Sequence, residues 1–497
     1  MSPQDAMFLH IEDANNPMHI GNVSVFEGPA PTYGDLVRTV AANLPLVPRY
    51  RQRVRFVPLE LGRPVWVDDA HFQILYHIRH TAVPSPGSAE QLRNLAGRVF
   101  AANLDRGRPL WELWMVDGLE GGRWALISKV HHCMVDGVSA TDLLTVLLDR
   151  EPQPTPTRAP AWHPQKEPSD LHLLADTVAD AILDPIDRIR GLPMLARANL
   201  AAGFSLTDLR NLAASYRTWL QPAAGELNGP IGPHRRWSWA SATLDEVKEV
   251  RAALGGTVND VVLAVITRGF RDLLLGRGAD VEGKVVRTLV PVSVRSEGEK
   301  GLYNNRVSGL FPGLPIGIED PVERLNNLRE QMTAFKGSGQ AVAGDVLTKL
   351  GGFAPPMLLS LGARLGTMFE QRMVQTVTTN VPGPQFPLYA AGRQLVYAYP
   401  YVPIAGSVRI SIAIFSYLGG LNFGVTGDWD TVTDIDVLTK GIEAGMAELV
   451  AIARKPARHT TQVRPARATT DGNGNGNGRK PAARRRPKAA ALSRPVP

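Results

Sequence analysis

Residues 123–137, RWALISKVHHCMVDG, run from an apolar β-type stretch into a pair of histidines and end on a glycine. Residues 111–116, WELWMV, form a second β-type stretch, and the DGLEGG between the two predicts a hairpin turn. After Gly137, apolar side chains recur at helical spacing up to Leu148. The sequence therefore predicts a strand, then a loop that carries two histidines, then a helix.

The histidine loop has the chemistry of a general base. An imidazole titrates near neutral pH, so it can take a proton from a hydroxyl group without strong tuning. His131 and His132 are neighbours on an extended segment and should point to opposite sides, which leaves open which of them reacts. Asp136 is expected to hold the loop by accepting backbone N–H bonds or by pairing with an arginine, and Gly137 to allow the turn. A histidine pair that is merely buried and hydrogen-bonded is the alternative.

Cysteine and metal chemistry are not favoured. The chain has one cysteine, Cys133, so neither an internal disulfide nor a cysteine-only zinc site can form. Alternation predicts that Cys133 points away from His132, which argues against a cysteine–histidine nucleophile pair. Adjacent histidines are also poorly placed to bind one metal ion, and the chain contains no HExxH pattern. We therefore expect no metal and no resident cofactor.

The length and composition indicate a globular α/β protein with more than one domain. Of 497 residues, 44% are hydrophobic and 20% charged, in a chain too long for one ordinary core. Six prolines between residues 152 and 168 indicate a linker, and low-complexity sequence follows Lys455. The predicted parts are an N-terminal domain with the histidine motif (1–150), a crossover linker with helices (151–234), a C-terminal domain (235–455) and a disordered basic tail (456–497).

Positive charge is concentrated at the end of the chain. From Lys455 to Pro497, eleven Lys and Arg stand against one Asp, a net charge of +10 that leaves −3 for the rest of a chain whose total is +7. A slightly acidic body does not indicate nucleic-acid binding. Neither a signal peptide nor a membrane-spanning helix is expected. The expected location is the cytoplasm, with the tail in peripheral contact with the inner membrane or with lipid droplets.

The C-terminal domain opens with recognisable local signals. Thr257-Val-Asn-Asp260 predicts a helix start, because threonine caps and Asp260 suits the helix dipole. Asn259 lies in this first turn. Its amide has either a structural role there or a role in a substrate channel or oxyanion site. Residues 408–425 predict a hairpin that turns at Gly419.

Several blocks, in order along residues 1–455, resemble one known family. HHCMVDG (131–137) resembles the HHxxxDG motif of the CoA-dependent acyltransferase superfamily. The other blocks are similar to those of the bacterial bifunctional wax ester synthase/diacylglycerol acyltransferase family. They are SPQDAMF (2–8), NPMH (16–19), DRGRPLW (105–111), TVNDV (257–261), PVSVR (291–295) and TNVPGP (379–384).

The resemblance implies a fold of two chloramphenicol-acetyltransferase-like α/β domains with a central channel between them. It implies that His132, at the position of the second motif histidine, is the general base. It would take the proton of a diacylglycerol or long-chain alcohol whose oxygen attacks the thioester of acyl-CoA, the co-substrate. Asp136 would organise the loop, with Arg295 as its partner. No acyl-enzyme is expected, since the chain has no GxSxG elbow.

Two other functions remain open at the level of the sequence. A condensation-type acyltransferase would use the same histidine motif with a different acceptor. A catalytically inactive lipid-surface binding protein would keep the fold without the chemistry, although the complete motif from His131 to Gly137 argues against it.

Overall fold

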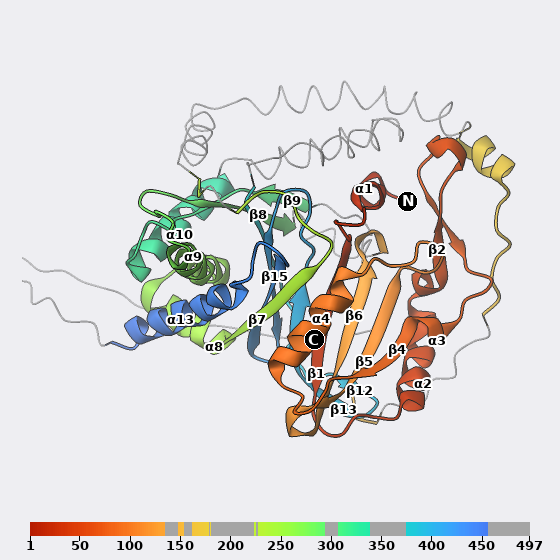
Figure 1. Ribbon diagram of the computed structural model, residues 1–497, viewed down its shortest axis with the longest axis horizontal. Helices are drawn as coiled ribbons and strands as arrows, with labels where there is room; N and C mark the ends of the chain where they lie inside the picture. The colour runs from red at the N-terminus through yellow and green to blue at the C-terminus, as the bar shows by residue number, and fades with distance from the viewer. Residues whose placement is uncertain are drawn as a thin grey trace, which may run out of the picture. The chain divides into compact units, whose positions relative to one another are not determined.

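The structure, a computed structural model, describes residues 1–134, 148–153, 162–177, 179, 223–224, 227–293, 307–337 and 374–455. Met1–Lys455 belong to one compact unit. Two mixed β-sheets with helices packed against them form its centre (Figure 1). The helix predicted after Gly137, most of the crossover linker and the basic tail lie outside the described residues.

The first sheet has six strands, in the order β12-β13-β1-β6-β5-β4. They are β1 (His19–Phe26), β4 (Ile78–Ala82), β5 (Trp111–Leu119), β6 (Arg123–His131), β12 (Tyr389–Ala390) and β13 (Arg393–Tyr401). β5 and β6 pair antiparallel, which confirms the predicted hairpin. On one face, Phe100 of α4 (Ala89–Ala101) joins a buried cluster with Ile127. On the other, Leu36 of α2 (Tyr33–Asn43) packs in a cluster with Leu126.

The second sheet has seven strands, with β10-β8-β11-β14-β15-β7 in order and β9 paired to β8. They are β7 (Arg235–Thr243), β8 (Val286–Ser293), β9 (Val307–Leu310), β10 (Gly313–Leu314), β11 (Thr376–Val381), β14 (Ile410–Tyr417) and β15 (Gly420–Asp428). The hairpin predicted around Gly419 is confirmed, since β14 and β15 pair antiparallel and Gly419 takes a φ of +80° that favours glycine.

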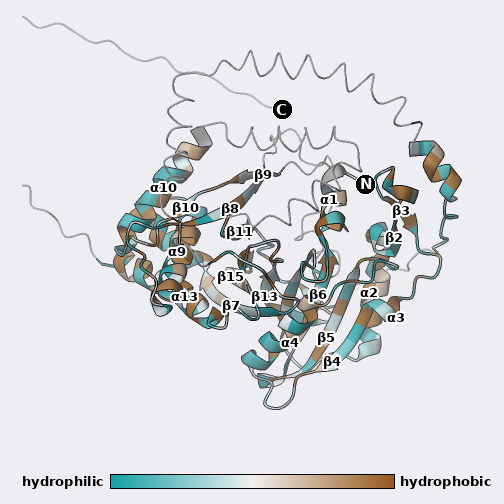
Figure 2. Cartoon of the chain, turned by 45° about the horizontal axis from the view of Figure 1, so that its top comes forward, coloured by the Kyte–Doolittle hydropathy of each residue, from teal (hydrophilic) through white to brown (hydrophobic). Residues whose placement is uncertain are grey.

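In the part of the chain that the structure describes, four helices share a core with the second sheet. They are α8 (Leu244–Leu254), α9 (Val258–Gly276), α10 (Pro321–Gly337) and α13 (Ile435–Ala453). Figure 2 shows hydrophilic and hydrophobic residues mixed along α10 and α13, as expected for helices with one buried face. Among the described helices none has by itself the length and hydropathy of a membrane span; α8 and α9 reach them only when taken together, across a bend of 101°.

The predicted helix start at Thr257 is confirmed. The Asp260 N–H donates to the Thr257 hydroxyl at 3.3 Å, and the Thr257 N–H donates to the Asp260 carboxylate at 2.7 Å. This reciprocal capping box satisfies two backbone donors at the start of α9 that would otherwise lack partners.

The C-terminal part of the chain supplies two strands, β12 and β13, to the first sheet. β13 pairs antiparallel with β1, with Tyr401 opposite Gly21. It also runs close to the second sheet, because a Cβ at Gly424 of β15 would collide with the backbone carbonyl of Pro400. The domain boundaries expected at residues 150 and 235 stay a prediction. Because β12 and β13 come from the C-terminal part of the chain but lie in the first sheet, the sheets do not follow the order of the chain.

Further elements of the described residues belong to the N-terminal part of the chain. They are α1 (Pro3–Ile11), α3 (Ile74–His77), the ribbon of β2 (Gln52–Arg55) and β3 (Val65–Asp68), and the 3-10 turns η1 (Leu44–Leu46), η2 (Pro48–Arg51), η3 (Pro58–Glu60), η4 (Glu120–Gly122) and η5 (His132–Met134). α1 matters most for function, because it packs on η5, where the histidine motif begins.

Candidate active site

The backbone of the histidine pair is held from both sides. β6 ends at His131, and His132 opens the 3-10 turn η5. The His131 N–H donates to the carbonyl of Leu110 at 2.9 Å, and the His132 N–H donates to the carbonyl of Met18 at 2.9 Å. Leu110 and Met18 belong to two of the blocks that resembled the family. These blocks therefore flank the histidines and fix where their side chains start.

The expected strand alternation does not extend past His131. Because the chain turns into a 3-10 helix at His132, the orientation of the second histidine is set by that turn and by what packs on it. The premise that both histidines lie on an extended segment was therefore wrong for His132.

His131 is fully buried and has a defined tautomer. The Cys133 N–H donates to its Nδ1 at 3.1 Å. A ring nitrogen that accepts a hydrogen bond carries no proton, so in the neutral imidazole the proton is on Nε2. Nε2 lies 3.5 Å from a carboxylate oxygen of Glu12, whose side chain is 2% exposed. His131 is thus oriented between its own turn and a buried acid.

Glu12 is itself held by a cation and a backbone donor. Its carboxylate accepts from Nε of Arg106 at 2.9 Å and from the Met18 N–H at 3.1 Å. Burial favours the neutral acid, but the contact with His131, the charge of Arg106 and the bond from the Met18 N–H favour the carboxylate more, so the pKa of Glu12 lies below its usual value. Glu12 is therefore ionised at neutral pH and lies between the buried ring of His131 and the partly exposed guanidinium of Arg106.

His132 is a neutral base at physiological pH. Its ring stacks on Phe8 of α1, with ring centroids 3.9 Å apart and planes 22° apart. Burial, and then the nearby His131, lower the pKa of His132 to about 4. The ring is therefore unprotonated at pH 7, the form that a general base needs, but it is a weaker base than the untuned imidazole expected from the sequence.

Cys133 contacts His131 rather than His132. The thiol sulfur lies 2.9 Å from His131 Nδ1, a contact that the sequence did not indicate. Burial, together with the carboxylates of Asp5 and Glu12, raises the pKa of the Cys133 thiol. The thiol is therefore protonated at neutral pH and has none of the thiolate character that a nucleophile needs.

The other predicted site residues are not brought to the histidines by any described contact. Asp136, Gly137 and Arg295 lie outside the described residues. Asn259 is half-buried in the first turn of α9, where Thr257 and Asp260 form the cap. The roles assigned to His131, His132 and these four residues stay predictions.

Three side chains at the site were missed as functional candidates, although each belongs to or lies between blocks already recognised: Phe8, Glu12 and Arg106. No sequence signal pointed to Glu12. Its place as the C-cap of α1, where a carboxylate is unfavourable toward the helix dipole, is visible only in the structure.

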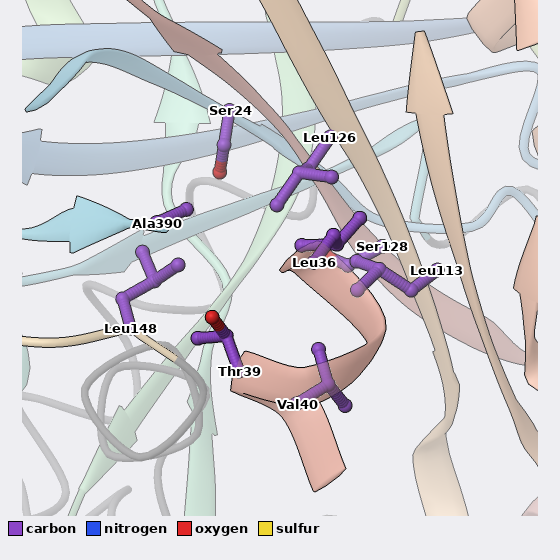
Figure 3. Close-up of a pocket in the computed structure, with 9 residues that line it drawn as sticks. All are labelled: Ser24, Leu36, Thr39, Val40, Leu113, Leu126, Ser128, Leu148 and Ala390. Atoms are coloured by element: carbon purple, nitrogen blue, oxygen red, sulfur yellow. The ribbon is translucent and has the colours of Figure 1, made fainter. Parts of the chain in front are cut away.

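A cavity of about 20 Å³ lies between α2 and the first sheet (Figure 3). Leu36 and Val40 of α2 face Leu126 of β6 there, with the hydroxyls of Ser24 and Ser128 also on its wall. This space holds roughly one water molecule, far less than a fatty acyl chain. The histidines do not line it, so it is separate from the site. Among the described residues no group of three or more His, Cys, Asp or Glu could hold a metal ion.

Comparison with solved structures identifies the fold class of the protein. Solved structures with the same fold include the first condensation domain of the calcium-dependent antibiotic synthetase, with a TM-score of 0.54, 17% identity and coverage of 92% of this chain and 96% of that one. Another is the wax ester synthase/diacylglycerol acyltransferase from Marinobacter aquaeolei VT8, with a TM-score of 0.61, 27% identity and coverage of 91% and 99%. The predicted fold class, two chloramphenicol-acetyltransferase-like α/β domains, is confirmed.

Sequence comparison identifies the family. The model of the "Wax ester synthase/diacylglycerol acyltransferase catalytic domain" matches residues 1–262, and that of the "WS/DGAT C-terminal domain" matches residues 303–450. A probable diacylglycerol O-acyltransferase of Mycobacterium tuberculosis is 37% identical over 453 residues, 91% of this chain and 96% of that protein. Another from the same species is 31% identical over 464 residues, covering 90% and 98%. The chain belongs to the wax ester synthase/diacylglycerol acyltransferase family, and it is an O-acyltransferase.

Proposed function

We propose that this enzyme moves a fatty acyl group from acyl-CoA to the free hydroxyl of diacylglycerol or of a long-chain alcohol, with His132 as the general base. The observation that carries the proposal is the neutral imidazole of His132, in the turn directly after β6, stacked on Phe8 and beside a buried histidine whose Nδ1 accepts a hydrogen bond. The names of the mycobacterial relatives support diacylglycerol as an acceptor.

The proposed reaction needs one proton shuttle and no covalent enzyme intermediate. His132 takes the hydroxyl proton as the acceptor oxygen forms a C–O bond to the thioester carbon. The tetrahedral intermediate then collapses, the C–S bond breaks, and the imidazolium returns the proton to the sulfur of coenzyme A. The products are an ester and free CoA thiol. The high pKa of the Cys133 thiol supports the direct route, because the only cysteine of the chain is not a thiolate.

The other motif residues support His132 and are not proposed to take part in proton transfer. His131 supports the motif through the bond that its Nδ1 accepts from the Cys133 N–H, and its Nε2 lies 3.5 Å from Glu12. Asp136 and Arg295 keep the supporting roles that the family resemblance implies, and Gly137 and Asn259 keep those that the sequence indicates.

The deciding experiment offers labelled acyl-CoA to the purified enzyme with dioleoylglycerol and hexadecanol in parallel reactions. Triacylglycerol, wax ester and released CoA thiol are then quantified. One thiol per ester, with ester formation lost in His132→Ala, is the expected result. Ester formation by His132→Ala at the wild-type rate would rule out the proposed base. Labelled protein after denaturation would contradict direct transfer.

We also propose a cytoplasmic enzyme that meets the membrane or lipid-droplet surface through its basic C-terminal tail. The support is the charge of the sequence, +10 from Lys455 onward against −3 for the remainder. Basic residues near an anionic lipid surface contribute about 1 kcal/mol each.

A further inference from the structure

One short helix reaches both histidines. Phe8 and Glu12 are four residues apart, a spacing that puts two side chains on the same side of a helix. Phe8 stacks on the ring of His132, while Glu12, the C-cap, faces Nε2 of His131. The first helix of the chain therefore contacts each member of a motif more than a hundred residues away.

The position of α1 is fixed at several points. At its start, the Ser2 hydroxyl accepts from the Asp5 N–H at 3.1 Å. At its end, Arg106 donates to the carbonyl of Leu9 at 2.8 Å and also binds Glu12. Ala6 and Leu9 are buried, at 1% and 2% exposure. The helix that carries Phe8 is thus held in place by contacts other than the stacking contact. The position of the aromatic ring next to His132 therefore does not depend on the stack itself.

We infer that Phe8 is a positioning residue for His132, holding the imidazole in the orientation that proton transfer requires and keeping water from one of its faces. This inference rests on the proposed role of His132. The side chain of His132 starts from a turn and is half-buried, so the backbone alone does not fix its ring. A flat ring 3.9 Å away and nearly parallel leaves the imidazole little freedom to rotate.

The contact also affects the proton affinity of His132. Of the nearby titratable groups, His131 acts directly on His132. Asp5, Glu12, Arg49 and Arg106 act on the adjoining Cys133. Among the described residues, the aromatic ring of Phe8 is the ring that stacks on the imidazole face. Removing that ring admits water, which stabilises the imidazolium and moves the pKa of His132 up toward its ordinary value near 6.5.

The test compares Phe8→Leu and Phe8→Met with the conservative Phe8→Tyr. The control is Phe56→Leu, which removes an aromatic contact that α1 makes through His10 and leaves the stack on His132 intact. We measure kcat and KM for acyl-CoA from pH 5 to 8, and thermal unfolding to confirm that each variant is folded.

Phe8→Leu and Phe8→Met should lower kcat by about 10- to 100-fold, the cost of a misplaced catalytic group, with KM changed less than about twofold. The acid limb of kcat/KM should move to higher pH in both. Phe8→Tyr and Phe56→Leu should stay within about threefold of wild type. Adding Phe8→Leu to His132→Ala should cause no further loss, because the positioned group is gone.

Wild-type kcat and an unchanged pH profile in folded Phe8→Leu or Phe8→Met would overturn the inference. An equal loss of kcat in Phe56→Leu would also overturn it, because the effect would then come from the packing of α1 and not from the stack on His132. If His132→Ala itself retains activity, the proposed base is wrong, and that failure is separate from any result at Phe8.

Discussion

Replacing Glu12 by glutamine removes the charge between His131 and Arg106 and leaves a side chain of the same shape. We expect this substitution to destabilise the folded enzyme at neutral pH. The reason is that the carboxylate is 2% exposed and accepts from Arg106 and from the Met18 N–H. A neutral amide oxygen can keep these contacts only in weakened form.

The size of the effect follows from the surroundings of each group. Truncating one partner of a buried ion pair costs about 3–5 kcal/mol when the other charge is left unpaired. Arg106 is 38% exposed and keeps its bond to Leu9, so water and the carbonyl compensate for part of the lost charge. We therefore expect a loss of about 1.5–2 kcal/mol, the low end for a hydrogen bond to a charged group.

The effect should depend on pH in a defined direction. The pKa of Glu12 in the folded state lies below the value of 4.5 for an unperturbed carboxyl. Its stabilising contribution is therefore complete above about pH 4.5 and disappears as the pH falls through the folded-state pKa. Glutamine does not titrate, so the difference between wild type and variant should be largest at pH 7 and shrink on acidification.

Urea unfolding followed by tryptophan fluorescence at pH 7 and pH 4 measures this difference. Glu330→Gln, an exposed carboxylate on α10, is the matched control and should change stability by less than about 0.5 kcal/mol. Equal destabilisation of Glu12→Gln at both pH values, or none at pH 7, would refute the account of Glu12 as an ionised partner of Arg106 and His131.

Three further outcomes are expected. His132→Ala should lower ester formation by about 100- to 10,000-fold with the fold intact, and His131→Ala by less; the reverse order in a radiolabelled acyl-CoA assay would exchange the two roles. The kcat/KM of the wild-type enzyme should show no acid limb near pH 6.5, because the pKa of His132 is lowered to about 4, and a limb at 6.5 in a pH–rate profile would contradict that environment. Truncation after Lys455 should reduce flotation with anionic vesicles at low salt but not with neutral ones, and equal flotation of both forms would leave the tail without a role at the surface.

The sequence by itself determined the features that depend on neighbours within a few positions. The β5–β6 hairpin, the capping box at Thr257 and the turn at Gly419 all follow from residues that contact one another locally. The histidine pair at a strand end is of the same kind, and ordered blocks along the chain were sufficient to identify the family.

Only the tertiary structure decided what surrounds the histidines. Glu12 faces His131 and Phe8 covers His132 across more than a hundred residues, and β13 joins β1 from the far end of the chain. No periodicity or spacing encodes such contacts, because they result from the packing of whole elements rather than from the conformation of one. The orientation of the reacting imidazole, and the low proton affinity that makes it a free base at neutral pH, arise from that packing.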